Sequence, residues 1–439
     1  MSASDVELPR EPVQRLVAPI QRFLHVEAMG GVVLLAAAVI ALIAANTGLA
    51  DAFLGFWKVQ LGFGVGDFRV DHTLKHWVSD GLMALFFFVV GLEVKRELVA
   101  GELQSLRGAA LPLAGALGGM VVPAAIYLAM LGDHPASRGW GIPMATDIAF
   151  VVGCMALLGK RAPARLRVFL LSLAIADDIG AILVIAIGYT DQLNLAALAL
   201  GGAGLGVVVG LRRLGVRVLG VYVVIGVGIW LAFHESGVHA TIAGVILGLL
   251  TPAQSWVSDS RMSQIIASAR DVWRGDGWEG FGSRRGLLQR VSAAAREALS
   301  PLERLENALH PWSAFLVMPV FALANAGVAF EASLVRDPVA LAVMAGLVVG
   351  KPLGIVGFCA VAVRLGFARL PDGVGWAAIA GGGCLAGIGF TMSLFIAGLA
   401  LDESVLDAAK VGVLCASLVS GALGMFVLAK LAPGDSEGA

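Results

Sequence analysis

Long apolar stretches, separated by short polar ones, dominate the chain. A membrane-spanning helix needs about 20 predominantly apolar residues, and twelve stretches are close to or above that length. They cover residues 27–48, 76–94, 108–131, 141–158, 168–189, 194–211, 217–233, 238–251, 312–330, 338–363, 375–400 and 405–429. Strand-like alternation is rare, and only helices and closed barrels satisfy backbone groups in hydrocarbon. The pattern therefore predicts an all-α membrane protein with twelve transmembrane helices.

The distribution of basic residues predicts the orientation of these helices. Most of the 31 Lys and Arg residues lie on one side of the predicted spans. Even without the long loop 251–310, that side has more than twice as many as the other. Because short loops rich in Lys and Arg stay in the cytoplasm, we expect both termini there. The first apolar stretch starts too deep for a typical signal peptide, so we expect it to be a retained span.

Two polar pieces interrupt the apolar pattern. Residues 59–74 alternate apolar and polar side chains around glycine-containing turns, which favours an external β-hairpin; a plain loop is the alternative. Residues 287–309 have apolar positions at helical spacing and an arginine-rich face, which predicts a helix on the anionic inner leaflet. The expected division is a cytoplasmic tail 1–26, helices 1–8 within 27–250, a cytoplasmic insertion 251–310, helices 9–12 within 311–430, and a cytoplasmic tail 431–439.

Composition agrees with a membrane protein and argues against several other classes. The chain is 58% hydrophobic and only 14% charged, whereas soluble domains carry about 25% charged residues. Its formal net charge of −1 offers no field that would attract nucleic acid. The four cysteines lie in apolar stretches without metal-like spacing, so we expect them to be small core residues. No cofactor is expected.

The fifth span contains the most informative charges. Asp177 and Asp178 are adjacent near its middle, and no basic residue lies between Leu171 and Thr190. A charged side chain at the centre of a bilayer costs about 2.5–3.5 kcal/mol on insertion scales. These two carboxyl groups must therefore face a water-filled cavity, hold protons or bind a cation. Paired carboxyl groups that exchange protons for a cation are the chemistry of an antiporter.

Two other spans contain residues that interrupt helices. Pro143 lies just before Thr146 and Asp147 in span 4, and span 11 has a glycine-rich run over 381–389. Such glycines are often only packing sites, and Pro143 could be a simple kink. However, both are the middle spans of triplets, spans 3–5 and 10–12, that run in opposite directions. Interrupted segments at matching positions of inverted-topology repeats indicate an ion site at the midplane.

Charged residues in the remaining spans fit such a site. Broken helices present partially positive N-termini and partially negative C-termini, which Asp147 and Lys351 respectively could compensate. Lys351 is the only cation deep within a predicted span, since Arg217 and Lys410 lie near the ends of theirs. It can lock two helices together as the counter-ion of an aspartate, or release that aspartate when a cation or proton arrives, through the same contact. Asp80, near the outer end of span 2, is equally well explained as a solvated helix end or as part of the ion path.

Eight motifs give the chain a specific resemblance. DDIGA, PMATDIAF, GLEVKREL, SGVHATIAG, LHPW, FALANAGV, GKPLGI and GIGFTMSLFIA occur in this chain. Together they resemble the NhaA family of bacterial sodium/proton antiporters over about residues 25–430, apart from the insertion. The resemblance implies a fold in which spans 4 and 11 are discontinuous and cross. It implies exchange of external H⁺ for cytoplasmic Na⁺ or Li⁺ across the bacterial inner membrane, for sodium and pH homeostasis.

The resemblance also implies roles for individual residues. Asp178 would be the main Na⁺ ligand and proton carrier, with Asp177 as its partner. Asp147 and Thr146 would support the site, and Lys351 would balance its charge and pair with Asp177. The residues implied in the pH response are Glu93, Lys95, Glu97, His239, Glu306 and His310. Asn307 stands where some members carry a histidine, and an ordinary solvated helix end remains the alternative for the residues at the cytoplasmic mouth.

The expected mechanism is electrogenic if both aspartates exchange protons, because two H⁺ would then move against one Na⁺. The expected partners are Na⁺, Li⁺, H⁺ and the bilayer, with a homodimer formed through hairpin 59–74. A sodium-coupled solute symporter of the same fold is the main alternative. An intramembrane aspartyl protease using Asp147 and Asp178 is a weaker one, because such an enzyme needs no buried lysine and no predicted span contains a GxGD segment.

Overall fold

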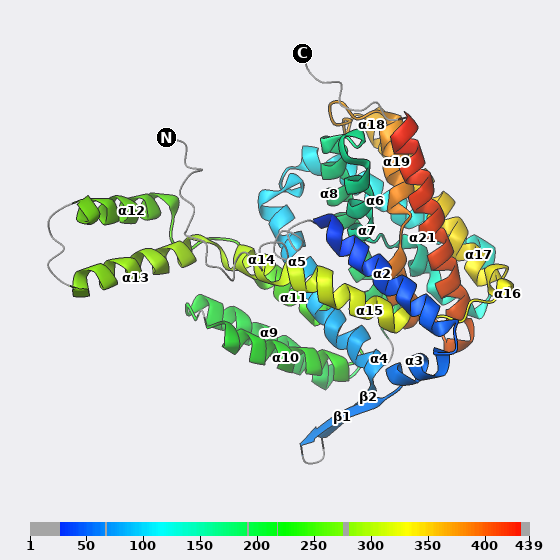
Figure 1. Cartoon of the computed structure of the whole chain (residues 1–439), viewed down its shortest axis with the longest axis horizontal. Coiled ribbons are helices and arrows are strands. Elements are labelled where there is room, and N and C mark those ends of the chain that lie inside the picture. Colours follow the sequence, from blue (N-terminus) through cyan, green and yellow to red (C-terminus); the bar gives the residue numbers. More distant parts are fainter. Residues whose placement is uncertain (1–26, 66–67, 191–192, 217, 275–280, 432–439) are drawn as a thin grey trace.

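The computed structural model describes residues 27–65, 68–190, 193–216, 218–274 and 281–431 (Figure 1). In this part of the chain, seven helices are long and apolar enough to cross a membrane, and three further pairs of helices are bent at a short break. Two shorter apolar helices, 219–235 and 241–250, accompany them. The predicted helical class is confirmed. The tails 1–26 and 432–439 lie outside the described residues.

The chain begins with a bent helical pair and a hairpin. Helices α2 (Glu27–Ala45) and α3 (Ala50–Trp57) meet at an angle of 119°. Strands β1 (Gln60–Val65) and β2 (Phe68–Thr73) pair antiparallel and project from the helical bundle (Figure 1). Residues 59–74 thus contain two strands rather than a plain loop.

The middle of the chain is a series of helices. One span runs over Leu74–Ala100 and comprises α4 (Leu74–His76), the π-helical η1 (Trp77–Leu82) and α5 (Met83–Ala100). After it come η2 (Glu102–Gln104), α6 (Leu106–Leu131), η3 (Pro135–Met144), α7 (Ile148–Leu158), η4 (Gly159–Arg161), α8 (Ala164–Gly188), α9 (Leu195–Arg213), α10 (Leu219–Glu235) and α11 (Thr241–Leu250).

The insertion is helical, but not in the way the sequence pattern predicts. Helices α12 (Asp259–Arg274) and α13 (Phe281–Ala298) run side by side away from the bundle (Figure 1). The expected continuous helix over 287–309 is wrong, because α13 ends and α14 (Pro301–Trp312) starts afresh. The Ser300 hydroxyl accepts from the Glu303 amide at 3.2 Å, and the Glu303 carboxylate accepts from the Ser300 amide at 2.9 Å. Such a capping box, with proline in the first turn, fixes a helix start.

Helix α14 continues without a break into the apolar helix that follows it. With η5 (Ser313–Val317) and α15 (Met318–Asn325) it makes one candidate span, Pro301–Asn325. The apolar stretch over 312–330 therefore belongs to a helix that begins three turns earlier. The chain ends with α16 (Ala332–Val335), α17 (Pro338–Met344), η6 (Ala345–Gly350), α18 (Lys351–Arg364), α19 (Trp376–Ala386), α20 (Phe390–Ala400) and α21 (Glu403–Leu431).

Glycines let some of these helices touch through their backbones. A Cβ atom on Gly118 of α6 would lie 2.1 Å from the carbonyl oxygen of Gly354 on α18, and one on Gly354 would lie 2.0 Å from that of Gly118. No side chain fits at either position, so the two helices pack at closest approach. Small residues serve this purpose in membrane helices, where lipid tails give no hydrophobic drive for association.

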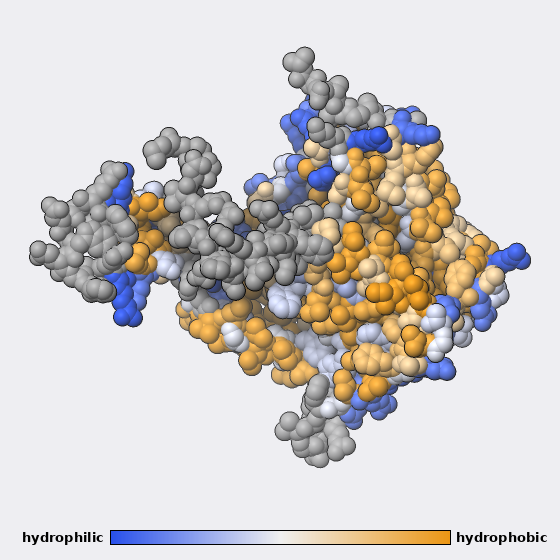
Figure 2. Space-filling view, in the orientation of Figure 1, coloured by the Kyte–Doolittle hydropathy of each residue, from blue (hydrophilic) through white to orange (hydrophobic). Residues whose placement is uncertain are grey.

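The outer surface is apolar, as expected of a protein surrounded by lipid. Hydrophobic residues cover the broad middle of the face shown, with hydrophilic residues towards its upper and lower ends (Figure 2). Large exposed side chains include Ile43, Ile187, Val224 and Leu418. Inside the bundle, α8 is buried through most of its length. Asp177 and Asp178 lie at its middle, so both are enclosed by other helices.

Candidate functional site

Two interrupted helices meet next to the middle of α8. Between η3 and α7 the backbone is extended at Ala145 and Asp147, and the two helices are bent by 40°. Between α19 and α20 the break falls at residues 387–389, and the bend is 46°. The Asp147 amide donates to the carbonyl oxygen of Ile388 at 2.6 Å. The two breaks are thus joined by a backbone hydrogen bond.

Local sequence explains why both helices stop here. Pro143 has no amide hydrogen and restricts the residue before it, so regular α-helix does not extend across the end of η3. In the other helix, Gly387 and Gly389 occupy positions where a Cβ atom would lie 2.5 Å from the Leu347 carbonyl and 2.1 Å from the Ser393 hydroxyl. The glycines of the break therefore allow close packing and the turn at the same place.

The Asp147 side chain contacts the N-termini of the two helices that follow the breaks, α7 and α20. One oxygen lies 3.4 Å from the amide of Phe150 in α7. The other accepts from the Thr391 amide of α20 at 3.1 Å and also from the Thr391 hydroxyl. The Asp147 side chain is buried, as is Thr391. A carboxylate at two helix N-termini is well placed, because their unpaired amides carry partial positive charge.

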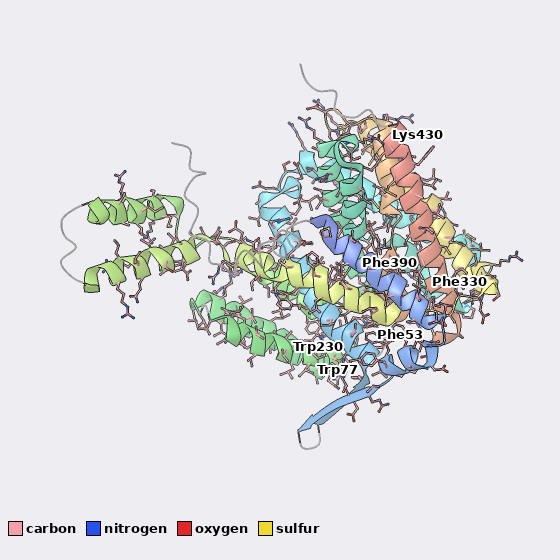
Figure 3. All side chains as sticks on the ribbon, viewed as in Figure 1. Phe53, Trp77, Trp230, Phe330, Phe390 and Lys430 are labelled. Atoms are coloured by element: carbon pink, nitrogen blue, oxygen red, sulfur yellow. The ribbon has the colours of Figure 1, made fainter. Side chains whose placement is uncertain are left out.

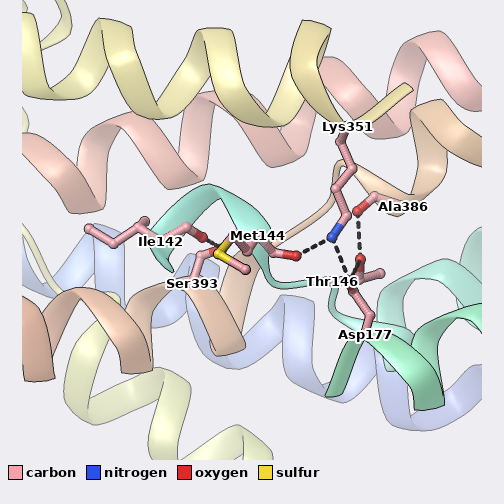
Figure 4. A network of polar contacts seen from close by, with 7 residues as sticks. All are labelled: Ile142, Met144, Thr146, Asp177, Lys351, Ala386 and Ser393. Carbon is pink, nitrogen blue, oxygen red and sulfur yellow. Dashed lines mark hydrogen bonds and ion pairs between the residues drawn. The ribbon is translucent and has the colours of Figure 1, made fainter. Parts of the chain in front are cut away.

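Lys351 binds the end of η3, on the other side of the break from α7. Its ammonium group donates to the carbonyl oxygen of Met144, the last residue of η3, and to Asp177 at 2.5 Å (Figure 4). Neither side chain of this ion pair is exposed. The Thr146 hydroxyl lies 2.7 Å from Asp177 and 3.0 Å from the Ala386 carbonyl. Three elements, α8, α18 and the η3–α7 break, are therefore tied together at one carboxylate.

Asp178 differs from its neighbour. Its side chain is 5% exposed, and it forms no hydrogen bond or ion pair with the residues that the structure describes. It interacts electrostatically with Asp177, Glu93, Asp147 and Lys351. One oxygen of Asp177, Oδ1, is also buried without a hydrogen-bond partner in the described part of the chain. The site thus presents carboxylate oxygens that receive no hydrogen bond from any group in the described part of the chain.

The charges of the site leave room for a cation. Three carboxyl groups, those of Asp147, Asp177 and Asp178, face a single ammonium group, that of Lys351. If all three are ionised, the site carries more negative than positive charge, in an environment from which most water is excluded. Such an excess is relieved by protons or by a hard cation, for which carboxylate and hydroxyl oxygens are suitable ligands. Chemically, the arrangement can exchange one for the other.

A hollow lies towards the N-terminal end of α8. It has a volume of about 440 Å³ and is lined by Arg96, Glu97, Ser172 and Ile175, among others. Ile175 lies three residues before Asp178, which is less than one helical turn. The Ser172 hydroxyl donates to Glu97 at 3.0 Å, and the Glu102 amide donates to the same oxygen at 2.9 Å. Polar groups therefore line part of this hollow, one helical turn from Asp178.

The predicted pH-response residues are only partly brought together. Glu93, Lys95 and Glu97 lie on α5, and Arg96 of the same helix forms an ion pair with Glu306 of α14. His310, one turn further along α14, is exposed.

His239 lies elsewhere. Its Nε2 atom lies 2.9 Å from the Tyr189 carbonyl oxygen, just beyond the far end of α8. Since a carbonyl only accepts, Nε2 is the donor in this contact. Tyr189 is 17 residues beyond Ser172, which contacts Glu97, so the two regions are about 25 Å apart along α8 at 1.5 Å per residue. His239 is therefore not part of the cluster around Glu97.

Sequence reasoning missed three polar contacts of this region. Thr391 binds Asp147 across 244 residues of sequence, Arg96 pairs with Glu306, and Ser172 binds Glu97. The only signal for Thr391 was its place just after the glycine-rich break. Nothing in the sequence marks Arg96 or Ser172 as special among the polar residues near helix ends.

Comparisons with known proteins match nearly the whole chain. The family model described as Na⁺/H⁺ antiporter 1 matches residues 21–428. A protein of Rhodopirellula baltica named Na(+)/H(+) antiporter NhaA is 53% identical over 421 residues, which are 96% of each chain. One of Rhizobium meliloti with the same name is 51% identical over 98% of this chain and 99% of its own. Na(+)/H(+) antiporter NhaA 2 of Acidiphilium cryptum is 49% identical over 98% and 96%.

Proposed function

The chain belongs to the Na⁺/H⁺ antiporter 1 family, and on that premise we propose that it exchanges cytoplasmic Na⁺ or Li⁺ for external H⁺. It is a secondary transporter rather than an enzyme, and the sodium-coupled symporter is not favoured, because the relatives that match nearly the whole chain are named as antiporters. The observation that carries the proposal is the contrast within one buried pair: Asp177 is held by Lys351, whereas Asp178 has no partner in the described structure.

In this proposal Asp178 is the main cation ligand and the proton carrier. At the cytoplasmic side, where protons are scarce, Na⁺ binds the oxygens of Asp178 and the unsatisfied oxygen of Asp177. At the external side, protons are abundant and displace it. The Thr146 hydroxyl lies against Asp177 and supports the site. Asp147 holds the starts of α7 and α20 in place, so that the geometry of the site survives the exchange.

Lys351 balances the charge of the site. When Na⁺ reaches Asp177, it competes with the ammonium group for the same carboxylate, so the ion pair loosens as the cation binds. The contact of Lys351 with the Met144 carbonyl then keeps its charge at the end of η3. If both aspartates exchange protons, two H⁺ move for one Na⁺ and exchange is electrogenic.

The acidic and basic residues at the end of the bundle near the hollow are proposed to adjust activity to pH. They are Glu93, Lys95, Glu97, Glu306 and His310. Their support is the short distance from the hollow to Asp178 along α8 and the ion pair that connects α5 to α14. His239, at the other end of α8, would act separately through its contact with Tyr189.

The finer architecture is also part of the proposal. The seven long helices, three bent pairs and two shorter apolar helices would be the twelve membrane spans, with both termini in the cytoplasm of a bacterium and the chain in its inner membrane. The segments α6 to α8 and α17 to α21 would be inverted-topology repeats, each with a broken helix in the middle. Hydrogen bonding between the two breaks supports helices that cross at the midplane.

Two surface features would contact other molecules. The hairpin has only two strands, and so presents open edges that can pair with another chain. We therefore propose a homodimer formed through residues 59–74.

The basic helices α12 and α13 would lie on the anionic inner leaflet, which attracts clustered arginines.

Reconstituted protein tests the exchange directly. Proteoliposomes with an imposed proton gradient, monitored by a pH-sensitive dye, should lose the gradient when NaCl or LiCl is added, but not when KCl or choline chloride is added. The response should be scanned over pH to reveal regulation. A gradient unaffected by Na⁺ at every pH, with Na⁺ uptake that requires an organic solute, would instead identify a symporter.

A further inference from the structure

Three histidines converge at the base of the hairpin: His72 and His76 are four residues apart, and His234 lies far along the chain. His72 lies in β2, His76 in α4 and His234 near the end of α10. Each offers one ring nitrogen, and these three atoms lie within 4.8 Å of one another. The Nε2 atoms of His72 and His234 are 3.1 Å apart, and the rings of His72 and His76 stack with centroids 4.1 Å apart. None of these residues takes part in the ion site at Asp178.

The surroundings of the cluster resemble those of a metal site. The carboxylate of Asp80 lies 3.4 Å from His76 Nε2 and 3.6 Å from His234 Nδ1. His76 Nε2 is buried, with no hydrogen-bond partner among the described residues. Trp230 stacks on the ring of His234 and lies near Trp77 (Figure 3), and Trp77 also contacts the ring of His72. An unsatisfied buried nitrogen, two further imidazoles and a carboxylate occupy one partly enclosed place.

We propose that His72, His76 and His234 bind a divalent transition-metal ion of the Zn²⁺ type. Imidazole suits Zn²⁺, Cu²⁺ and Ni²⁺ rather than Na⁺, Ca²⁺ or Mg²⁺, which prefer oxygen. Two nitrogens bound tetrahedrally at about 2.0–2.1 Å from Zn²⁺ lie about 3.3 Å apart. The separation of 3.1 Å between the Nε2 atoms of His72 and His234 is close to that value. These two rings can therefore share one ion with little movement, and the His76 nitrogen, within 4.8 Å of both, would have to move closer.

Asp80 has the position of an outer-sphere partner. Histidine ligands usually donate their second ring N–H to a carboxylate, which fixes the ring and increases its basicity as a ligand. With Nε2 of His234 facing the metal, Nδ1 faces Asp80 at 3.6 Å. The carboxylate also supplies negative charge next to the cation. The sequence offered two explanations for Asp80, a solvated helix end or a part of the ion path, and this is a third.

The bound metal would add a link between elements that already meet at Trp77 and Trp230. His72 belongs to the projecting hairpin, His76 to the start of the long span Leu74–Ala100, and His234 to α10, which pairs with α9 beside the bundle (Figure 1). A metal ion held by all three would clamp the hairpin base to α10. We expect it to raise the thermal stability of the protein without being needed for exchange.

Metal binding to tag-free purified protein tests the proposal. After removal of metals by a chelator and equilibrium dialysis against ZnCl₂, elemental analysis should find one tightly bound Zn²⁺ per chain, and Co²⁺ should give the visible absorption of a tetrahedral site. The variants His72→Gln and His234→Gln should each weaken binding at least 100-fold, and Asp80→Asn should weaken it about 10-fold. His134→Gln, a histidine outside the cluster, is the matched control and should bind as the wild type does.

Folding is checked separately from binding. The His72→Gln and His234→Gln variants should retain Na⁺-driven dissipation of a proton gradient, and should lose the rise in melting temperature that Zn²⁺ gives the wild type. Absence of saturable Zn²⁺ binding to the wild type, or wild-type affinity in both variants, would overturn the proposal. So would loss of binding in His134→Gln equal to that in the two cluster variants.

Discussion

Charged side chains are buried at the centre of the bundle and exposed in the projecting pair of helices α12 and α13. At the centre, Asp147, Asp177 and Lys351 are almost completely buried, and each is bound by other protein groups. In α12 and α13, polar and basic residues such as Arg261 and Arg290 are exposed, where water satisfies them. Burying a charge costs several kcal/mol in real proteins even after relaxation. A buried charge without a partner therefore requires a function, whereas a solvated one does not.

Asp178 shows the difference between the two regions most clearly. It is as enclosed as its neighbours, yet it has no hydrogen-bond or ion-pair partner among the described residues. If Asp178 had only a structural role, an uncharged residue in its place would make the fold more stable. We therefore expect changes at the centre to abolish transport and changes in the pair α12–α13 to leave it nearly intact.

The largest effect is expected from Asp178→Asn. The amide keeps the size of the side chain but neither carries a proton nor balances Na⁺, so Na⁺-driven gradient dissipation in proteoliposomes should fall to the level of empty vesicles. The matched control is Asp133→Asn, in an exposed turn after α6, which should transport normally. Exchange by Asp178→Asn at the wild-type rate and apparent affinity would contradict the site assignment.

Lys351→Met should destabilise the protein strongly, because it leaves Asp177 buried without its counter-ion. Breaking a buried ion pair costs about 3–5 kcal/mol, which should lower the melting temperature in detergent. Adding Asp177→Asn to Lys351→Met should recover part of the loss, as expected for coupled residues. Lys410→Met is the control, since this buried lysine lies 3.4 Å from a largely exposed Asp407 and should lose less. Equal falls in melting temperature for the two lysine variants would show that the ion pair of Lys351 with Asp177 is no more important for stability than that of Lys410 with Asp407.

Thr391→Val should have a moderate effect. It removes the hydroxyl that donates to Asp147 but keeps the size of the side chain and the backbone contact. A hydrogen bond to a charged group contributes about 1.5–3 kcal/mol, so melting temperature should fall and the apparent Na⁺ affinity should weaken severalfold. Thr391→Ser, which retains the hydroxyl, should behave much more like the wild type. If Ser and Val variants are equally impaired, packing rather than the hydrogen bond matters at this position.

Deleting residues 256–296 should have the smallest effect on exchange. The Trp256 amide donates to the Glu297 carbonyl at 3.2 Å, so the two ends of the deleted segment already lie together and can be joined. Exchange at the best pH should stay close to the wild type, while the activity–pH profile can shift, because α14 brings Glu306 to Arg96. Complete loss of exchange at every pH in a well-inserted deletion variant would place the insertion in the transport machinery.

The same contrast explains what the sequence could predict. Buried charges and helix-breaking residues are rare in apolar spans, so Asp147, Asp177, Asp178 and Lys351 could be recognised from their positions alone. The breaks near Pro143 and after Gly383 follow from backbone chemistry. The strands of the hairpin followed from alternation. The breaks and the strands depend on local sequence, whereas the charged residues stand out because burying a charge costs free energy.

Features that depend on the packing of distant segments could not be predicted in this way. Thr391 and Asp147 are 244 residues apart, and one threonine among many apolar residues gives no sign of its partner. Apolar periodicity continued through Leu299, so the pattern merged α13 with α14, although the Ser300–Glu303 capping box was readable in the sequence. The histidine cluster combines His72 and His76, four residues apart, with His234 of α10, which no spacing rule connects to them.

Competition between Na⁺ and H⁺ at Asp178 is the central claim, and proton release tests it most directly. Purified protein in weakly buffered detergent solution, near the pH at which exchange is half-maximal, should release protons when NaCl or LiCl is added, and KCl should release none. Asp178→Asn should release none with any salt, while Asp133→Asn should release as many as the wild type. Undiminished Na⁺-dependent proton release from Asp178→Asn would contradict the account, because the competing proton would then belong to another group.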